Sequence, residues 1–234
     1  MYQETLWNSV TLLQPEDQFR LGTDSVACAA FARFSHGAAV ADLGCGSGAI
    51  ALMLLASDPS LQVTGVELQP EAARLAQENA ARSGLNCTVL EGDLREIRSL
   101  LPAGSMDGVI SNPPYFPVGS GPGGPRAAAR SEQTCTLAQL TQAAAWLLKF
   151  GGSFVLVHRP ERLADLIWEL RCQKLEPKRI RLVRHHAGAD ANLVLIAARR
   201  GGKPGVMLEP ELLLFTPDGQ ETAETRRIYH HQED

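Results

Sequence analysis

The chain has 234 residues, of which 44% are apolar and 21% are charged, which is the ordinary composition of a globular protein. No apolar run approaches the roughly 20 residues that a membrane-spanning helix needs, and the N-terminus lacks the basic and apolar segments of an export signal. Five scattered cysteines without a Cys-x-x-Cys pair indicate reduced thiols and argue against a zinc site. The composition therefore predicts a cytoplasmic protein that binds no metal and no membrane.

The formal net charge is −4, but the basic residues are clustered. Residues 159–203 contain 11 Lys and Arg against 5 Asp and Glu, and these 11 are half of the chain's 22 basic residues. Such a cluster is either an ordinary solvated surface or a surface that faces phosphate groups. The charge pattern alone leaves both interpretations open.

The first 36 residues are predicted to form a short hairpin and a helix that pack on the core, before a domain that spans residues 37–234. Residues 5–7 and 10–13 are typical of two strands around a turn. Thr23 or Asp24 predicts the N-cap of an apolar helix over about residues 25–34. This Thr-Asp pair either only caps the helix or also borders a ligand cleft.

An apolar strand over residues 38–43 leads into Gly44-Cys45-Gly46-Ser47-Gly48 and then into a helix over about residues 49–56. Strand, glycine turn and helix in this order are typical of nucleotide-binding domains. The glycines matter because they let the backbone approach a ligand without a Cβ in the way.

Two further strands each end in an acid. The strand over residues 63–67 ends in Glu67, 19 residues after the last glycine of the turn, which is the usual spacing of a carboxylate that binds ribose hydroxyls. A helix is predicted from Pro70 to Ser83, and a third strand over residues 87–90 is followed by Asp93. Both acids therefore lie where open α/β sheets bind ligands.

The fourth strand, over residues 106–111, runs into Asn112-Pro113-Pro114-Tyr115. Two consecutive prolines fix φ twice and stiffen the backbone. The Asn112 side-chain oxygen and the Pro113 carbonyl can then both accept hydrogen bonds from one planar amino group, beside the aromatic ring of Tyr115. The tetrapeptide is thus either a receptor for a flat –NH2 group or a proline turn, and the tetrapeptide alone leaves both interpretations open.

The rest of the chain continues the pattern of alternating helices and strands. Residues 119–130 are rich in Gly, Pro and Ala and are predicted to form a loop beside the site, with Arg126 and Arg130 as its only charges. The later predicted elements are a helix over residues 137–150, a strand over 153–158, a helix over 160–173, strands over 178–183 and 192–198, and a strand-like run over 212–215.

The glycine turn also fits the pattern G-x-G-x-x-A of dinucleotide-binding proteins, so NAD is an alternative ligand. Three features favour S-adenosylmethionine. Asp42, two residues before the first glycine, can face the cationic end of the ligand, and Asp93 suits an adenine edge. The amino-group receptor at Asn112 has no use in hydride transfer. We therefore predict S-adenosylmethionine as the cofactor.

These motifs together resemble those of the class I S-adenosylmethionine-dependent amino-methyltransferases. Over nearly the whole chain, the sequence is similar to the bacterial tRNA(Val) adenine-N6 methyltransferases, which modify the adenine beside the anticodon. The finer marks of this resemblance are the runs at residues 20–24, 112–117, 157–163, 175–180 and 201–204.

The resemblance implies an α/β fold with a Rossmann-like, seven-stranded, mostly parallel sheet, helices on both faces and an antiparallel last strand. It implies S-adenosylmethionine as cofactor, S-adenosylhomocysteine as product, no metal, and the anticodon loop of a tRNA as partner. The catalytic residues that it implies are Asn112, Pro113 and Tyr115. The implied cofactor ligands are Thr23, Asp42, Gly44, Gly46, Gly48, Glu67, Asp93 and Asn112. The implied RNA contacts are Pro114, Phe116, Arg126, Arg130, Arg159, Lys178, Arg179, Arg181 and Lys203.

Four other functions stay open at this point. Release-factor glutamine methyltransferases resemble this chain in the same Asn-Pro-Pro-Tyr receptor, although such enzymes usually carry an N-terminal helical domain. Methylation of a guanine amino group in ribosomal RNA is a second alternative, and methylation of adenine in DNA is a third. A non-catalytic RNA-binding or S-adenosylmethionine-sensing module is the fourth, but it would have no need of Asn112 and Tyr115.

Overall fold

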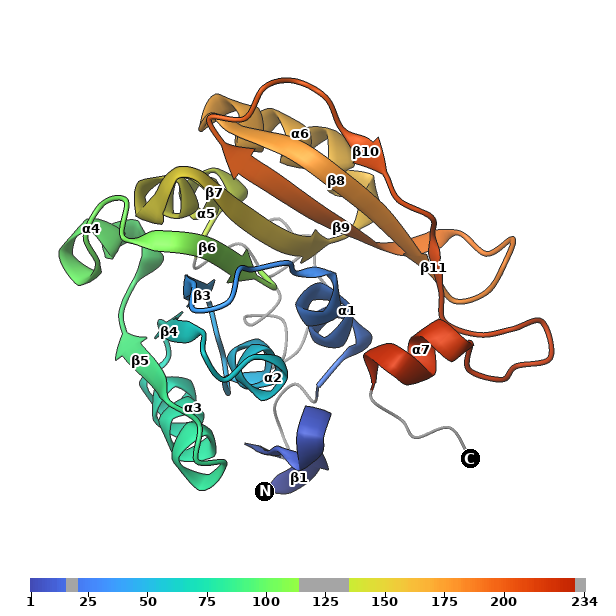
Figure 1. The fold of residues 1–234 in the computed structure, drawn as a ribbon, viewed down its shortest axis with the longest axis horizontal. Helices are drawn as coiled ribbons and strands as arrows, with labels where there is room; N and C mark the ends of the chain where they lie inside the picture. Colours follow the sequence, from blue (N-terminus) through green and yellow to red (C-terminus); the bar gives the residue numbers. More distant parts are fainter. Residues whose placement is uncertain (16–20, 114–134, 230–234) are drawn as a thin grey trace.

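A mixed β-sheet forms the centre of the protein (Figure 1). The computed structural model describes residues 1–15, 21–113 and 135–229. Seven long strands lie in the order β8-β9-β7-β6-β3-β4-β5. Neighbours are parallel except at β9, which is antiparallel to both β7 and β8. This confirms the predicted mostly parallel sheet with an antiparallel last strand.

The strands have the following bounds: β3 Ala39–Leu43, β4 Gln62–Glu67, β5 Cys87–Glu91, β6 Met106–Ser111, β7 Leu148–His158, β8 Leu175–Arg184 and β9 Ala191–Arg200. Two short strands, β10 Met207–Leu208 and β11 Leu212–Leu213, extend the sheet by pairing with β8. The strand-like run predicted over residues 212–215 contains β11, whereas β10 was not predicted from the sequence.

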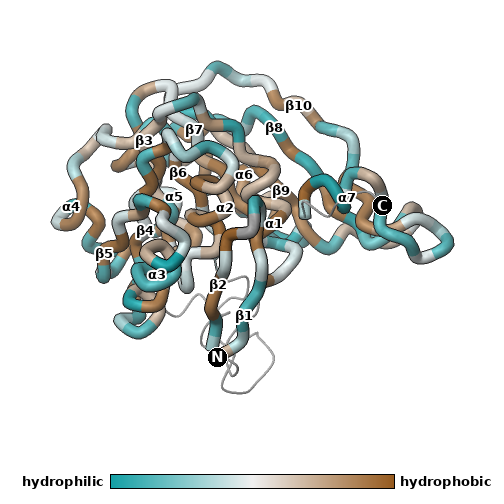
Figure 2. The backbone as a smooth tube through the Cα atoms, turned by 60° about the horizontal axis from the view of Figure 1, so that its bottom comes forward, coloured by the Kyte–Doolittle hydropathy of each residue, from teal (hydrophilic) through white to brown (hydrophobic). Residues whose placement is uncertain are grey.

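Helices cover both faces of the sheet. Their bounds are α1 Thr23–Phe31, α2 Ala49–Ser57, α3 Pro70–Arg82, α4 Ile97–Leu100, α5 Leu137–Leu147, α6 Leu163–Cys172 and α7 Ala223–Ile228. Successive strand residues point to opposite faces. Along β7, Val155 and Val157 therefore pack in one core with α1 and α2, whereas Phe154 and Leu156 pack in a second core with α5 and α6. Figure 2 shows the hydrophobic positions gathered in this interior.

Local signals explain several helix starts. Thr136 and Gln139 form a reciprocal capping box at the start of α5, and Pro70 occupies the first turn of α3. The predicted cap of α1 is wrong by one residue: Gly22 is the N-cap, and Thr23 is already helical. Gly22 adopts an extended backbone there, so Thr23 is the first helical residue and the Thr-Asp pair lies in the first turn of the helix.

The boundary between α5 and β7 also differs from the prediction. The helix was expected to reach residue 150, but it ends at Leu147, and β7 begins at once with Leu148, which pairs with Met106 of β6. Apolar residues suit a buried helix and a buried strand equally well. Pairing with β6 therefore decides the boundary, and the local sequence does not. The expected helix over residues 160–173 similarly begins as a 3-10 turn, Pro160–Arg162, before α6.

The N-terminal hairpin is formed by β1 Tyr2–Thr5 and β2 Thr11–Gln14, joined by the 3-10 turn Trp7–Ser9. The buried side chain of Asn79 in α3 fixes the hairpin, because it bonds to both the N–H and the carbonyl of Leu13. Its Nδ2 also donates to the Ser47 carbonyl at 3.0 Å. The hairpin is thereby tied to the glycine turn. The division of the chain at residues 36 and 37 stays a prediction.

Among the described residues, no helix is long and apolar enough to span a bilayer.

Candidate functional site

The glycine turn after β3 forms the floor of the candidate site. Gly44, Gly46 and Gly48 have φ of 73°, 55° and 88°, a left-handed conformation that favours glycine. The N–H groups of Gly44 and Cys45 donate to the Val66 carbonyl at 2.8 and 3.2 Å, which ties the turn to the end of β4. A Cβ at Gly44 or Gly46 would meet no other heavy atom of the described chain within 4 Å. The turn therefore leaves open space in which a ligand can lie against the backbone.

Glu67, at the end of β4, stabilises this turn through its side-chain carboxylate. Its Oε2 accepts from the Gly46 N–H at 2.8 Å, and its Oε1 accepts from the Gln69 N–H at 2.9 Å. Only 8% of the residue is exposed. Each carboxylate oxygen still has a lone pair for a further donor.

Asp42 lies under the turn and is 1% exposed. Neither of its carboxylate oxygens has a hydrogen-bond partner in the part of the chain that the structure describes. Burial, assisted by the negative charge of Glu67, raises the pKa of this carboxyl to about 7. The Ala51 N–H opposes the shift without meeting the geometry of a hydrogen bond. A buried carboxylate without a partner is costly, so Asp42 is the group here that most needs a cationic or donating ligand.

Asp93 follows β5, next to β4, and the Gly92 N–H bonds to the Glu67 carbonyl at 2.8 Å. Its carboxylate caps a 3-10 turn through the Arg95 N–H at 2.9 Å. It also pairs with the Arg95 side chain, whose Nε lies 2.8 Å from Oδ2. This pairing holds the pKa of Asp93 below its usual value. Asp93, which the sequence predicts to bind the adenine of the cofactor, therefore already has a cationic partner in Arg95. The sequence analysis did not predict this ion pair.

Asn112 and Pro113 follow β6, beside the carboxyl end of β3. The Ser111 hydroxyl donates to the Leu43 carbonyl at 2.7 Å and joins these two strand ends. Asn112 Nδ2 donates to the Ser25 hydroxyl oxygen at 2.9 Å. The amino-group receptor predicted from the sequence is thus adjacent to the glycine turn and to the first turn of α1. Pro114, Tyr115, Phe116, Arg126 and Arg130 lie outside the described residues.

Thr23, the first residue of α1, borders the same region. Its hydroxyl oxygen accepts from the Tyr229 hydroxyl at 2.9 Å. The structure thus brings the ends of β3, β4, β5 and β6 and the start of α1 to one edge of the sheet. Asp42, the three glycines, Glu67, Asp93 and Asn112 all lie along that edge. Their roles as ligands stay predictions.

The basic residues predicted to contact RNA have several intramolecular partners. Arg179 Nε lies 2.6 Å from Glu209 Oε1, and Arg181 Nη2 lies 2.8 Å from Glu224 Oε2. Both arginines are largely buried, and they hold the segment after β9 against β8. Those partner acids lie beyond residue 203, where the count of clustered charges stopped. This explains why the sequence suggested a larger free positive charge than the structure contains.

The remaining three predicted RNA contacts differ among themselves. Arg159 Nη1 donates to the Asn192 carbonyl at 2.9 Å. Lys178 Nζ donates to the carbonyl of Lys203 at 3.0 Å and to that of Gly205 at 2.5 Å. The Lys203 residue itself is exposed. Contact of these residues with RNA stays a prediction.

Arg179→Ala is expected to lower the free energy of unfolding by about 1–3 kcal/mol, between the values of exposed and buried ion pairs. The guanidinium also donates to the Phe31 carbonyl and lies 4.1 Å from the centre of the Phe31 ring, so its loss frees α1 as well as Glu209. Urea unfolding would measure the effect, with Lys203→Ala as the exposed control, expected to change stability by less than about 0.5 kcal/mol. Equal stability of the two variants would contradict the structural role of Arg179.

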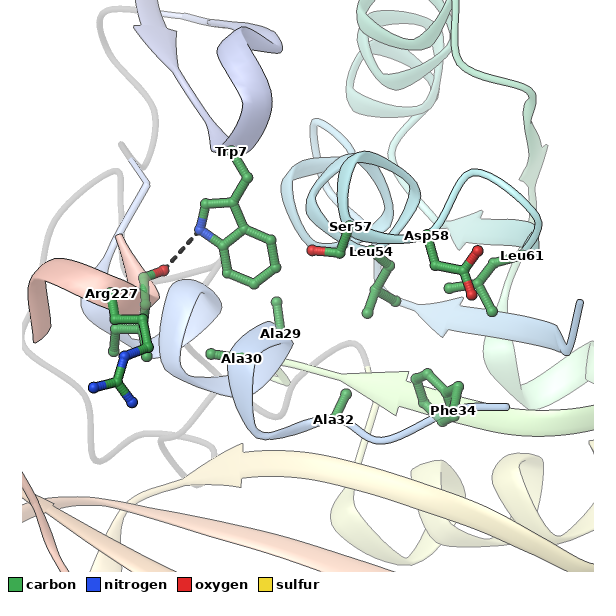
Figure 3. A pocket seen from close by; sticks show the side chains of 11 residues that line it. Trp7, Ala29, Ala30, Ala32, Phe34, Leu54, Ser57, Asp58, Leu61 and Arg227 are labelled. Atoms are coloured by element: carbon green, nitrogen blue, oxygen red, sulfur yellow. Dashed lines mark hydrogen bonds between the residues drawn. The ribbon is translucent and has the colours of Figure 1, made fainter. Parts of the chain in front are cut away.

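A cavity of about 300 Å³ lies away from this edge, at the opposite end of α2 (Figure 3). Its lining is mostly apolar and includes Trp7, Phe34 and Leu54, with Asp58 and Arg227 as charged groups. Trp7 Nε1 donates to the Ile228 carbonyl at 2.7 Å and closes one side (Figure 3). Because α2 begins at the glycine turn and ends at this cavity, the cavity is not part of the candidate site.

Two residues that sequence reasoning missed support the site. Asn79 falls at helical spacing on the buried face of α3 that also carries Ala72 and Ala76, so a polar residue on an apolar face was the available signal. Ser25 carried no such signal, because its partner Asn112 lies 87 residues away.

Gly65→Ala is expected to weaken both folding and cofactor binding. A Cβ at Gly65 would lie 2.7 Å from the Cys45 sulfur in the glycine turn. Relieving that contact must displace the turn or strand β4, at a cost of about 1–3 kcal/mol. Thermal unfolding and S-adenosylmethionine titration calorimetry would measure the two effects. The double variant Gly65→Ala/Cys45→Ala removes the sulfur and should recover most of both losses. No recovery would show that the clash is not the cause.

Comparison with known proteins agrees with this arrangement. The sequence pattern of the methyltransferase small domain family matches residues 26–167. A tRNA1(Val) (adenine(37)-N6)-methyltransferase of Photorhabdus laumondii is 32% identical over 89% of this chain and 86% of its own length. A release factor glutamine methyltransferase of Geobacter sulfurreducens is 45% identical, but over 42% of this chain and 34% of its own length.

Among solved structures, a predicted O-methyltransferase from Agrobacterium tumefaciens superposes with a TM-score of 0.74. It is 23% identical and covers 89% of this chain and 96% of its own, so it supports the fold alone. The family pattern covers more than half of the chain and includes the glycine turn, Glu67, Asp93 and Asn112. The chain therefore belongs to the methyltransferase small domain family.

Proposed function

We propose that the protein transfers the methyl group of S-adenosylmethionine to the exocyclic N6 of an adenine in tRNA, next to the anticodon of a valine tRNA. The observation that carries the proposal is the position of Asn112 and Pro113, directly beside the glycine turn at the carboxyl edge of the sheet. The tRNA1(Val) (adenine(37)-N6)-methyltransferase relatives that align with most of the chain support this substrate over others.

The residues at the sheet edge fit S-adenosylmethionine. The open space at Gly44 and Gly46 admits a ligand against the backbone. The buried carboxylate of Asp42 offers a negative partner for a cationic amino-acid group. Glu67 can accept from ribose hydroxyls, since each of its oxygens has a second lone pair. Asp93 lies one strand further along and suits the adenine edge. The cofactor supplies an activated methyl group on a positively charged sulfur.

The acceptor nitrogen is the harder chemical problem. Its lone pair is delocalised into the adenine ring, which makes the amino group a poor nucleophile. Asn112 Oδ1 and the Pro113 carbonyl accept hydrogen bonds from this amino group and favour a more tetrahedral nitrogen. They also stabilise the positive charge that develops on it during transfer, as preorganised dipoles do at other sites. Tyr115 stacks on the base and fixes its plane.

No general base is required among the protein residues, since the proton can leave to water after transfer. Much of the acceleration then comes from positioning. The adenine must leave its stack to enter the site, as in other base-modifying enzymes. A base in an anticodon loop is already single-stranded, so moving it out of the stack costs little free energy there. Arg126, Arg130 and exposed residues such as Lys203 would contact phosphates.

Glutamine methylation of a release factor is the second candidate, because an amide –NH2 suits the same receptor. The curated glutamine methyltransferases match a smaller share of this chain than the tRNA enzymes do, 42% against 89%. Methylation of a guanine amino group uses the same chemistry and has less support from the comparisons.

The test is to incubate the protein with tritium-labelled S-adenosylmethionine and bulk tRNA from a strain that lacks this gene. The RNA is then digested and the labelled nucleoside identified. Label in N6-methyladenosine is the expected result. Label in a guanosine, or only in a release-factor band when that protein is added, would overturn the adenine assignment. Binding of the cofactor without transfer to any acceptor would overturn the proposed substrate class.

A further inference from the structure

The catalytic role proposed for Asn112 depends on which end of its carboxamide faces the acceptor. The oxygen end accepts a hydrogen bond from an amino group, whereas the –NH2 end presents a second donor and repels it. The two ends have nearly the same shape. Something must therefore hold the side chain in the productive orientation.

The first turn of α1 supplies this contact. Asn112 Nδ2 donates to the Ser25 hydroxyl oxygen at 2.9 Å, in a partly buried position. With its –NH2 end on Ser25, the carboxamide presents its oxygen away from α1. The Ser111 hydroxyl, bonded to Leu43, fixes the backbone immediately before Asn112.

Ser25 is itself held in place from several sides. Its N–H donates to Asp24 Oδ1 at 2.9 Å. One turn further along α1, the thiol of Cys28 contacts the Ser111 carbonyl at 3.7 Å. Two residues before Ser25, the hydroxyl oxygen of Thr23 accepts a hydrogen bond from the Tyr229 hydroxyl. Helix α1 is thus anchored both to the end of β6 and to the segment that follows α7, and these contacts hold the backbone that carries Ser25.

We propose that Ser25 is a positioning residue that sets the orientation of the Asn112 carboxamide for methyl transfer. This inference rests on the proposed function, because it concerns the same acceptor site. Ser25 acts through Asn112 and does not touch the reacting atoms. The three residues that follow it in α1, Val26, Ala27 and Cys28, are buried and carry no hydroxyl.

The kinetic test compares Ser25→Ala with Ser25→Thr, which keeps the hydroxyl. Ser25→Ala should lower kcat about 10-fold, the range expected for one lost hydrogen bond, with little change in the KM for S-adenosylmethionine. Ser25→Thr should recover most of kcat. Ser105→Ala is the matched control, because its hydroxyl bonds to the Pro102 carbonyl at the opposite end of β6. If Ser25 had only a structural role, Ser25→Ala would lower thermal stability, and KM would rise while kcat falls. That result would contradict the proposal.

A double-mutant cycle isolates the orientation itself. In Asn112→Asp, both ends of the side chain are acceptor oxygens, so the orientation no longer matters. Ser25→Ala should then change the residual kcat of Asn112→Asp by less than about 2-fold, which is within the usual error of additivity. An equal 10-fold loss in both backgrounds would overturn the proposal.

Hydrogen exchange of the Asn112 side-chain amide tests the role of Ser25 without any enzymatic turnover. The side-chain amide signal of Asn112 in a 1H–15N NMR spectrum is identified by its loss in Asn112→Asp. Its protons should exchange with water at least about 10-fold faster in Ser25→Ala than in the wild type and in Ser105→Ala. Unchanged exchange would overturn the role of Ser25 even if tRNA is methylated. Faster exchange together with no labelled tRNA would instead count against the proposed substrate.

Discussion

Asn112→Ala is expected to reduce kcat for transfer to adenine by about 100- to 1,000-fold, the loss seen when one preorganised dipole is removed from a reacting centre. The variant lacks the side-chain oxygen proposed to accept from the amino group, while the Pro113 carbonyl remains. Binding of S-adenosylmethionine should change far less, because Asp42 and the glycine turn are untouched. Single-turnover transfer from labelled cofactor to tRNA, with cofactor affinity from calorimetry, would measure both quantities.

The matched control is Asn112→Asp, which keeps acceptor oxygens at the same position and should retain more activity than Asn112→Ala. Loss of the Asn112–Ser25 hydrogen bond should lower the unfolding free energy of Asn112→Ala by only about 1 kcal/mol. Thermal unfolding checks that the loss of turnover is not a loss of fold. A kcat within about 3-fold of the wild type would exclude Asn112 from the acceptor site.

The sequence predicts the central part of the fold well because its signals are local. Apolar strands over residues 38–43, 63–67 and 106–111 are each followed by residues that break a strand, and β3, β4 and β6 appear with nearly those bounds. The boundary at Leu148 could not be read in this way. Leu147 and Leu148 are both apolar and fully buried, and pairing with Met106 in β6 decides between helix and strand.

The candidate site likewise contains residues that local spacing predicts and contacts that it does not predict. Asp42, Glu67 and the glycines are found by spacing within one βαβ unit, so the sequence places them at one edge of the sheet. The Asn112–Ser25 bond joins residues from separate elements and has no local pattern. The cluster of basic residues at 159–203 suggested too large a free positive charge for a related reason. Arg179 and Arg181 pair with acids in a later segment, and a count over consecutive residues does not include those partners.

Asp42→Asn should have opposite effects on stability and on cofactor binding. The pKa of Asp42 is raised to about 7 by burial, from an ordinary value near 3.8. Between these values the folded protein holds a proton that the unfolded chain has released. The contribution of Asp42 to stability therefore falls as pH rises from about 4 to about 7, by about 4 kcal/mol in total. Asparagine does not titrate, so Asp42→Asn should gain stability relative to the wild type on going from pH 5.5 to pH 8.

Cofactor binding should follow the reverse trend. Only the ionised carboxylate attracts the cationic amino-acid group of S-adenosylmethionine, so the affinity of the wild type should rise with pH up to about pH 7 and then level off. Asp42→Asn should bind about 10- to 100-fold more weakly at pH 8, the range of a lost charged hydrogen bond, and should lose the pH dependence. Calorimetry at pH 5.5, 7 and 8, paired with urea unfolding at the same values, would measure both trends.

Asp107→Asn provides the matched control, since Lys149 and the Ala39 N–H hold the pKa of Asp107 below its ordinary value. That carboxylate stays ionised across the whole range from pH 5.5 to pH 8, so its replacement should leave both pH profiles parallel to those of the wild type. Asp107 also lies at the amino end of β6, away from the glycine turn. A pH dependence of cofactor affinity that survives in Asp42→Asn would assign the titration to another group, and would remove Asp42 from the proposed cofactor contacts.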